Sequence, residues 1–264
     1  MAGYERAATL KQLKYYQTSQ KCEGEIPISG QGIYDESSTQ KYEVGTRLAL
    51  GDGRVFYYCK NGATALSVGR PVQAVTNRTM VANITNVTAG DDYVTIDSAA
   101  AAITAGDYDN GYAIIHDVGH MYKIRHSPTI AASGSGNIYL YDVVGFATST
   151  NDVTIFKNPC HSVIALADPI SFMIGVTLIA VTANYYFWAQ TWGPCGVLTK
   201  ATTAVEKHRL LYPSYSGVSL IGTGVSAAAW TTGVTGAHRV GYITYDSTAL
   251  QGGEYELVFL TCMA

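Results

Sequence analysis

The sequence has few charged side chains. Asp, Glu, Lys and Arg make up 14% of its 264 residues, whereas an ordinary globular domain has about 25%. Two long stretches, Pro169–Thr199 and Leu210–His238, contain none of the four. Such stretches must be buried in a core or against other copies of the chain, because large exposed apolar surfaces drive association. We therefore expect a protein whose surface is largely covered by neighbours.

The first uncharged stretch is long enough to cross a bilayer, for which about 20 apolar residues suffice. Its composition favours strands instead, because Val, Ile, Thr and aromatic residues dominate it. Gly175 and Asn184 divide it into strand-length pieces. No cluster of Lys or Arg flanks it to set an orientation in a membrane. We predict no membrane partner.

Other features that the sequence lacks limit the cell compartment and the binding partners that we expect. The net charge is −3 and no basic stripe is present, so nucleic acid is not an expected partner. The N-terminal residues lack the apolar region of a secretion signal. The five cysteines are odd in number, widely spaced and form no CxxC pair. We expect free thiols in a protein assembled in a reducing cytoplasm, with no zinc ribbon and no redox motif.

The histidines offer one candidate metal site. His116 and His120 are four residues apart, and His126 follows. Two such residues share a face of a strand, and Asp117 or Asp142 could complete a set of ligands only through the tertiary fold. A turn at Gly119 is predicted to separate the first two histidines, so structural roles are the better interpretation.

The remaining candidates for chemistry are equally weak. Cys160–His161 with Asp168 resembles a nucleophilic cysteine with assisting catalytic residues. Neighbouring residues on a strand point to opposite faces, however, so the thiol and the imidazole would diverge. Asp107–Gly111 has oxygen ligands at alternate positions without the distal Glu of a calcium loop. The glycine-rich segments at 133–136 and 222–224 match no phosphate-binding motif. We predict no catalytic residue, no cofactor and no metal.

The dominant pattern is that of short strands. Alternating or bulky apolar segments separated by turns occur throughout residues 45–264, for example RVFYYC, YVTID, GYAIIH and MYKIRH around an Asp-Val-Gly-His turn, NIYLYDVV, DVTIF, YYFWAQTW and EYELVFL. This spacing is typical of sandwiches and barrels. We predict an all-β fold, an antiparallel β-sandwich or barrel body over 45–264, with a less regular Gly/Ser/Thr-rich segment at 201–236.

Residues 1–44 differ from the body, because they are polar, hold many of the charges and have too few apolar residues for a core. Two interpretations stay open for this segment. It is an extended arm that becomes ordered on a partner, or an ordinary mobile terminus.

The aromatic residues carry the strongest physical signal. The chain has 20 tyrosines, which provide apolar area with a hydrogen-bonding tip and suit interfaces. In YYFWAQTW both faces of one strand carry large rings, so we expect a core on one side and a subunit contact on the other, rather than a sugar platform. The predicted interface residues are Tyr4, Tyr15 and Tyr16 in the arm and Tyr185, Phe187, Trp188 and Trp192 in the body.

Four segments together resemble a known group of proteins. TRLALGDGRVFYYCKNGATALSVGRPVQA, DNGYAIIHDVGHMYKIRHS, ANYYFWAQTWGPCGVL and YELVFL are similar to structural proteins of tailed bacteriophages, of the type common in marine and cyanobacterial phages. The similarity runs from about residue 40 to the end and is poor over 201–236. The resemblance implies a virion component, a capsid decoration (cement) protein that lies on the capsid surface after assembly in the host cytoplasm.

The resemblance also implies the partners, which are the major capsid protein and further copies of the chain. A homotrimer would suit the threefold positions of an icosahedral lattice. The alternatives are a receptor-binding fibre or spike that binds glycans, or another head or tail subunit. A hydrolase ranks last, because no pair of carboxylates is visible.

Overall fold

The fold was determined from a computed structural model of the chain. It describes residues 30–75, 79–98, 101–116, 118–147, 151–167, 172–198, 210–213, 220–222, 240–243 and 255–263. Regular structure in these residues is all β-strand, as the sequence predicts, and the sheets are antiparallel. Since this part of the chain contains no helix, it also has none that could span a bilayer.

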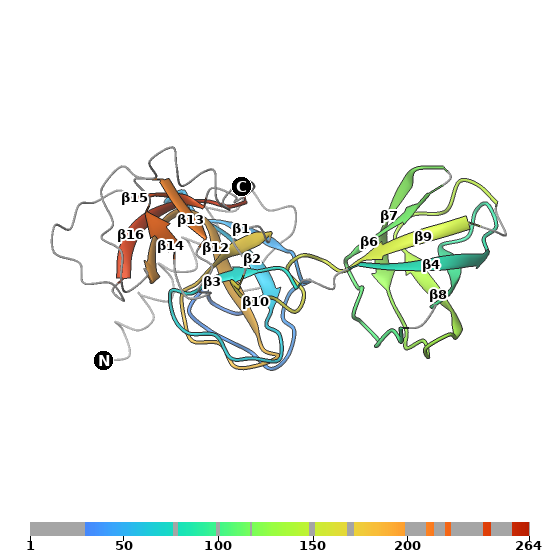
Figure 1. Cartoon of the computed structure of the whole chain (residues 1–264), viewed down its shortest axis with the longest axis horizontal. Coiled ribbons are helices and arrows are strands. Elements are labelled where there is room, and N and C mark those ends of the chain that lie inside the picture. Colours follow the sequence, from blue (N-terminus) through green and yellow to red (C-terminus); the bar gives the residue numbers. More distant parts are fainter. Residues whose placement is uncertain are drawn as a thin grey trace, which may run out of the picture. The chain divides into compact units, whose positions relative to one another are not determined.

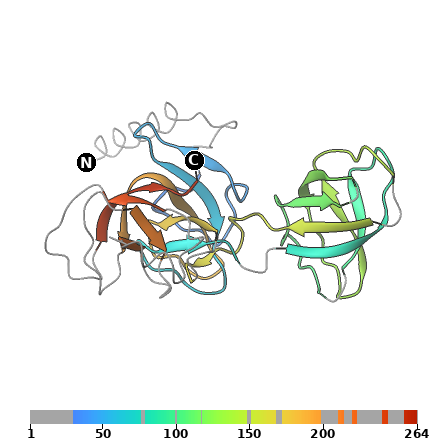
Figure 2. The same ribbon diagram turned by 45° about the horizontal axis from the view of Figure 1, so that its top comes forward.

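The chain divides into two compact units, whereas its sequence predicts a single body over 45–264. Unit 1 combines residues 1–74 with 162–264, and unit 2 consists of the intervening residues 75–161. Figure 1 labels strands of each unit, and Figure 2 shows the same ribbon turned by 45° about the horizontal axis. Unit 2 is therefore an insertion within the sequence of unit 1.

Unit 2 is a closed six-stranded barrel with the strand order β4-β5-β8-β7-β6-β9. Strands β6, β7 and β8 follow one another as neighbours, and β9 returns to pair with β6, which is a Greek key. Closure pairs every strand on both sides and so leaves no open edge. The strands are β4 (Thr79–Asn86), β5 (Tyr93–Asp97), β6 (Tyr112–Ile115), β7 (His120–His126), β8 (Ser135–Leu140) and β9 (Asn151–Phe156).

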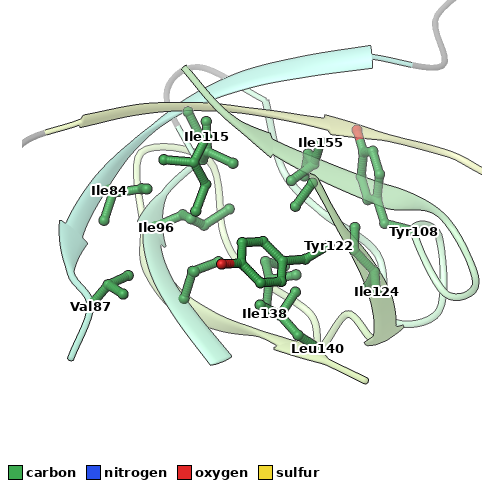
Figure 3. Close-up of a cluster of buried hydrophobic side chains, with 14 of the residues drawn as sticks. Ile84, Val87, Ile96, Tyr108, Ile115, Tyr122, Ile124, Ile138, Leu140 and Ile155 are labelled. Carbon is green, nitrogen blue, oxygen red and sulfur yellow. The ribbon is translucent and has the colours of Figure 1, made fainter. Parts of the chain in front are cut away.

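Strict alternation of side chains builds the interior of this barrel. In β5, for example, Val94 and Ile96 are fully buried while their neighbours are partly exposed. β-Branched residues dominate the interior because they pack well on a pleated surface. Figure 3 shows Ile96, Ile115, Ile124 and other side chains that meet in the barrel core.

Unit 1 contains a ten-stranded sheet. Its main path is β10-β3-β11-β12-β16-β15-β13-β14, and β2 pairs with both β1 and β12. The strands are β1 (Arg47–Ala49), β2 (Val55–Lys60), β3 (Pro71–Gln73), β10 (Ile164–Ala165), β11 (Met173–Thr177), β12 (Tyr186–Leu198), β13 (Leu210–Pro213), β14 (Leu220–Gly222), β15 (Gly241–Ile243) and β16 (Tyr255–Thr261).

Strand β12 is the longest element and connects two parts of this sheet. Its first half pairs with β2, and its second half, from Trp192 on, pairs with β16. The change of partner coincides with an irregular register between Gln190 and Trp192. Gly193 there has φ of +88°, a conformation that glycine adopts without steric cost. The bulge therefore lets one strand serve two neighbours.

Residues 30–44, assigned to the arm from the sequence, pack on unit 1. Ile33 and Val44 are buried, and Ser37 forms a β-bridge with Tyr186. These contacts place the C-terminal part of the predicted arm in the body. The predicted interface residues Tyr4, Tyr15 and Tyr16 lie outside the described residues, as does most of the segment 201–236.

Candidate interaction surfaces

A buried aromatic cluster occupies the place where the sequence predicts a core or subunit contact. Phe56 and Tyr58 from β2 and Trp188 from β12 have no exposed surface. The Trp188 ring lies 5.0 Å from that of Tyr58 and 5.2 Å from that of Tyr42, measured between ring centroids. Tilted and edge-on ring pairs of this kind add stability beyond the area they bury. Tyr42 shows that residues preceding β1 supply part of this cluster.

Residues 30–44 cover the cluster and are held there by hydrogen bonds; we call them the strap. The Trp188 indole Nε1 donates to the Gln31 carbonyl oxygen at 2.9 Å. The Tyr58 hydroxyl donates to Gln31 Oε1 at 2.7 Å, and Gln31 Nε2 donates to the Tyr186 carbonyl oxygen at 2.7 Å. Gln31 thus forms hydrogen bonds with polar groups on both strands of the cluster. Buried polar groups require such partners.

A second contact holds the strap further along. The Glu36 carboxylate accepts hydrogen bonds from the Thr182 backbone N–H at 2.6 Å and from its hydroxyl at 2.8 Å. Hydrogen bonds to a charged acceptor are stronger than those between neutral groups. The strap is therefore fixed to the body at both Gln31 and Glu36.

The predicted interface residues of the body differ from one another in how far they are buried. Phe187 and Trp188 have no exposed surface, so within this chain they are core residues and cannot contact a second copy. Both faces of the strand are covered, as predicted, but the chain itself covers them. Tyr185 and Trp192 are partly exposed, and Trp192 packs edge-on against Phe259 at 5.8 Å.

Trp192 belongs to an apolar face that the second half of β12 forms with β16 and β15. We call it the uncharged sheet face, and it comprises Trp192, Leu198, Tyr242, Tyr255, Leu257 and Phe259. The outward positions of Trp192–Leu198 and Tyr255–Thr261 contain no charged residue. Tyr255 is 57% exposed and Leu257 49%, whereas Val197, Val258 and Leu260 on the opposite side are buried.

The aromatic rings on this face are ordered by contacts with one another. Tyr242 stacks on Phe259 with 5.2 Å between ring centroids and 12° between ring planes. The sequence predicts EYELVFL as a strand, but Tyr255, Leu257 and Tyr242 are not among the predicted interface residues. The alternation in this segment predicts two faces, and it does not say which of the two apolar faces is covered.

The candidate metal and calcium residues have protein partners instead. The three histidines each contact a different residue: His116 Nε2 lies 2.7 Å from the Thr154 hydroxyl, His120 Nδ1 3.2 Å from the Tyr122 hydroxyl, and His126 Nδ1 3.3 Å from an Asp109 carboxylate oxygen. No group of potential ligands that could hold a metal ion occurs in the described residues.

The acidic turn at 107–111 is held together by donors from the barrel. Asp107 accepts from Lys157 Nζ at 2.8 Å, and Asp109 accepts from the Ser127 backbone N–H at 2.7 Å. Both carboxylates are thereby engaged within the protein. These contacts support the interpretation of the turn as structural.

Most of the cysteines that the structure describes are shielded from solvent. Cys59, Cys160 and Cys195 are buried, and Cys160 precedes His161 in a turn rather than on a strand. Burial raises the pKa of the Cys195 thiol to about 12. Burial also raises the pKa of Cys262 to about 12. A nucleophilic cysteine needs a lowered pKa, so neither thiol is suited to that role.

Comparison with known proteins gives no relative. No family model matches the chain, and no curated protein or solved structure is similar to it at a significant level.

Proposed function

We propose that this chain is a non-enzymatic structural protein of a tailed-phage virion, a capsid decoration (cement) protein. In this proposal it sits on the capsid surface after assembly in the host cytoplasm. It stabilises the head by contacting the major capsid protein and further copies of itself, as a homotrimer. The observation that carries the proposal is the uncharged sheet face, a rigid apolar surface on a chain with few charges.

The sheet face has the properties that a permanent protein contact requires. Its residues lie on paired strands, so their positions are fixed before binding and little ordering is needed. Fully burying a Leu or Phe side chain contributes about 1.5–3 kcal/mol. Several such residues on each copy would give a weak single contact, and repetition over a lattice makes weak contacts strong. Residues 1–29 would add contacts to the shell as the gripping arm.

A glycan-binding spike is the second candidate, and the run of neighbouring rings formed by Trp192, Phe259 and Tyr242 is the observation that favours it. Sugar sites combine an aromatic platform with polar side chains that bind hydroxyl groups. Among the outward residues of Trp192–Leu198 and Tyr255–Thr261, the polar side-chain groups are the Trp192 indole N–H, the Tyr255 hydroxyl and the Thr261 hydroxyl, and none is charged. The apolar composition therefore supports protein contact over sugar binding.

The location of the protein tests the proposal directly. Electron microscopy of purified particles should show it at stoichiometric, ordered positions on the head, and particles without it should lose their contents at lower temperature. Absence of the protein from purified virions would refute the proposal. Glycan binding that is lost in Trp192→Ala, with the fold intact, would favour the spike instead.

A substitution on the sheet face tests the observation that carries the proposal. Leu257→Asp places a charge in the contact, and an unpaired buried charge costs several kcal/mol. We expect loss of binding to capsids that lack the protein. Val143→Asp is the matched control, because Val143 is 63% exposed and lies outside the face in unit 2. Equal binding by both variants would exclude the sheet face as the contact.

A further inference from the structure

A lysine lies between two accessible tyrosines on the outside of the unit 2 barrel. Lys123 on β7 is paired with Tyr112 on β6, and the Tyr141 backbone N–H donates to the Lys123 carbonyl oxygen at 3.0 Å. Residues next to them in sequence, such as Ala113 and Ile124, are buried in the barrel core, so these side chains point outward. Tyr112 is 38% exposed and Tyr141 45%. We call these three residues the Lys123 patch.

Lys123 has no carboxylate partner among the described residues, in contrast to the other described cations of unit 2. Arg125 and Lys157 each contact an aspartate, at 2.7 and 2.8 Å. The Lys123 ammonium instead lies 4.9 Å from the centre of the Tyr141 ring. A cation over an exposed ring is held only weakly and keeps its charge. The partly exposed ammonium is therefore available to an anion from outside.

The barrel fixes the positions of both rings before any ligand arrives. The Tyr141 hydroxyl donates to Asn110 Oδ1 at 3.2 Å, and Asn110 is only 7% exposed. Tyr112 lies on β6, which is paired with β7 on one side and with β9 on the other. Within the described residues the Tyr112 hydroxyl makes no hydrogen bond. Little ordering is thus needed on binding, and one hydroxyl remains available to a ligand.

A similar lysine in unit 1 lacks these properties. Lys60 Nζ lies 5.8 Å from the centre of the Tyr186 ring. That ring, however, stacks on the buried Tyr58 with 9° between ring planes and belongs to the edge of the aromatic cluster. The Lys123 patch differs because both of its rings are exposed beside the ammonium.

The chemistry of the patch fits a sugar that carries one carboxylate. The carboxylate would pair with the ammonium, the apolar face of the sugar ring would lie on a tyrosine ring, and a sugar hydroxyl would bind the Tyr112 hydroxyl. Nucleic acid is disfavoured, because residues 75–161 contain eight Asp, no Glu and four Lys or Arg, which gives a net charge of −4. An acidic side chain of a protein would use the lysine but neither ring.

We propose that the Lys123 patch binds a hexuronic acid residue of a glycan, with the carboxylate on Lys123 and the sugar ring against Tyr112. These residues lie on neighbouring strands about 4.8 Å apart. One sugar ring covers that distance, so the convex surface of the barrel does not prevent the contact. A single contact of this kind is weak, and many copies on one particle would strengthen it; that last step alone rests on the proposed virion role.

The test uses the full chain and saturation-transfer NMR, which detects weakly bound ligands. The probes are methyl glucuronide, methyl glucoside, which has no carboxylate, and acetate, which has no ring. An exposed ion pair changes an equilibrium constant by up to about fivefold, so the glucuronide should bind about fivefold more strongly than the glucoside. Acetate should bind more weakly than the glucuronide. No glucuronide signal, or equal binding of the two sugars, would refute the proposal. Equal binding of acetate would also refute it, because any carboxylate, such as a protein side chain, would then suffice.

Two variants and two matched controls locate the site, with circular dichroism to check each fold. Lys123→Met should reduce glucuronide binding to that of the glucoside, and Tyr112→Thr should weaken binding of both sugars. Lys60→Met removes the other lysine beside a ring, and Trp192→Ala removes a ring of the sheet face; both should bind like the wild type. Unchanged binding by Lys123→Met, or loss in Trp192→Ala, would overturn the assignment. The inference does not depend on the virion role, because a protein absent from virions can still bind this sugar.

Discussion

Replacing Tyr58 by Phe tests how the strap is held on the aromatic cluster. The substitution removes one oxygen from a side chain that has no exposed surface. It keeps the ring and its edge-on contacts with Tyr42 and Trp188. The lost oxygen donates to Gln31 Oε1 at 2.7 Å and accepts from the Lys41 backbone N–H at 3.1 Å. Any loss of stability is therefore due to these two hydrogen bonds.

The magnitude follows from those bonds. A hydrogen bond between neutral groups contributes about 0.5–1.5 kcal/mol net, so we expect the variant to lose about 1–3 kcal/mol of unfolding free energy. Tyr255→Phe is the matched control. Its hydroxyl makes an exposed 3.4 Å bond to the Val68 carbonyl oxygen, and surface changes are usually within about 0.5 kcal/mol.

The assay can isolate unit 1, because Trp188, Trp192 and Trp230 all lie outside the inserted residues 75–161. Denaturant unfolding followed by tryptophan fluorescence should show a lower midpoint for Tyr58→Phe with an unchanged slope. A midpoint equal to that of the wild type would show that the strap hydrogen bonds do not stabilise unit 1. A changed slope would indicate that the variant alters the unfolding transition itself.

The same residue predicts a dependence on pH. Burial raises the pKa of Tyr58 from 10.0 to about 12. The folded state therefore keeps this proton more tightly than the unfolded state, and its contribution to stability is full below pH 10 and is lost as the pH rises to about 12. Tyr58→Phe lacks this group. The difference in stability between wild type and variant should thus shrink over that range.

One further substitution and one chemical treatment test the packing of unit 2 and the burial of two thiols. Gly111→Ala should destabilise unit 2 by about 3 kcal/mol or more, because the new Cβ would lie 2.0 Å from the Phe156 carbonyl oxygen. The unfolding transition of the barrel should disappear from circular dichroism, while the transition followed by tryptophan fluorescence stays. An unchanged barrel transition would contradict the close packing at Gly111. Cys195 and Cys262 should resist alkylation at pH 8 in the folded protein and react after unfolding, because their pKa values are raised to about 12. Their raised values also predict falling stability from pH 9 to 12, and rapid native-state labelling of either thiol would refute the assignment.

Local patterns in the sequence were sufficient for the elements of the barrel. YVTID alternates cleanly, and β5 has the same bounds, Tyr93–Asp97. The turn between GYAIIH and MYKIRH was predicted from Asp-Val-Gly-His, and β6 and β7 form that hairpin with Gly119 at φ of +65°. Both features depend only on neighbouring residues. This is why they are visible without tertiary information.

The strap and the sheet face were not predictable in the same way. Residues 30–44 are mostly polar, and they stay on the body through side-chain and backbone hydrogen bonds rather than through an apolar pattern. Gln31 gives no signal, because its partners Tyr58 and Trp188 are distant in sequence. For β16, alternation indicates that Leu257 and Val258 face opposite sides. Only the packed sheet shows that Val258 is buried and Leu257 is exposed.

The division into two units was hidden for a related reason. The insertion begins after β3 and ends before β10, and these two strands pair with each other, with Gln73 opposite Ile164. The first and last strands of the barrel, β4 and β9, also pair, with Thr79 opposite Phe156. The two ends of the insertion therefore follow the antiparallel pair β3–β10, and the insertion itself begins and ends with the antiparallel pair β4–β9, as in a long hairpin. Its ends are already adjacent, so joining the units adds little loop-closure entropy. No Gly/Ser/Pro-rich linker is needed, which explains why composition gives no boundary there.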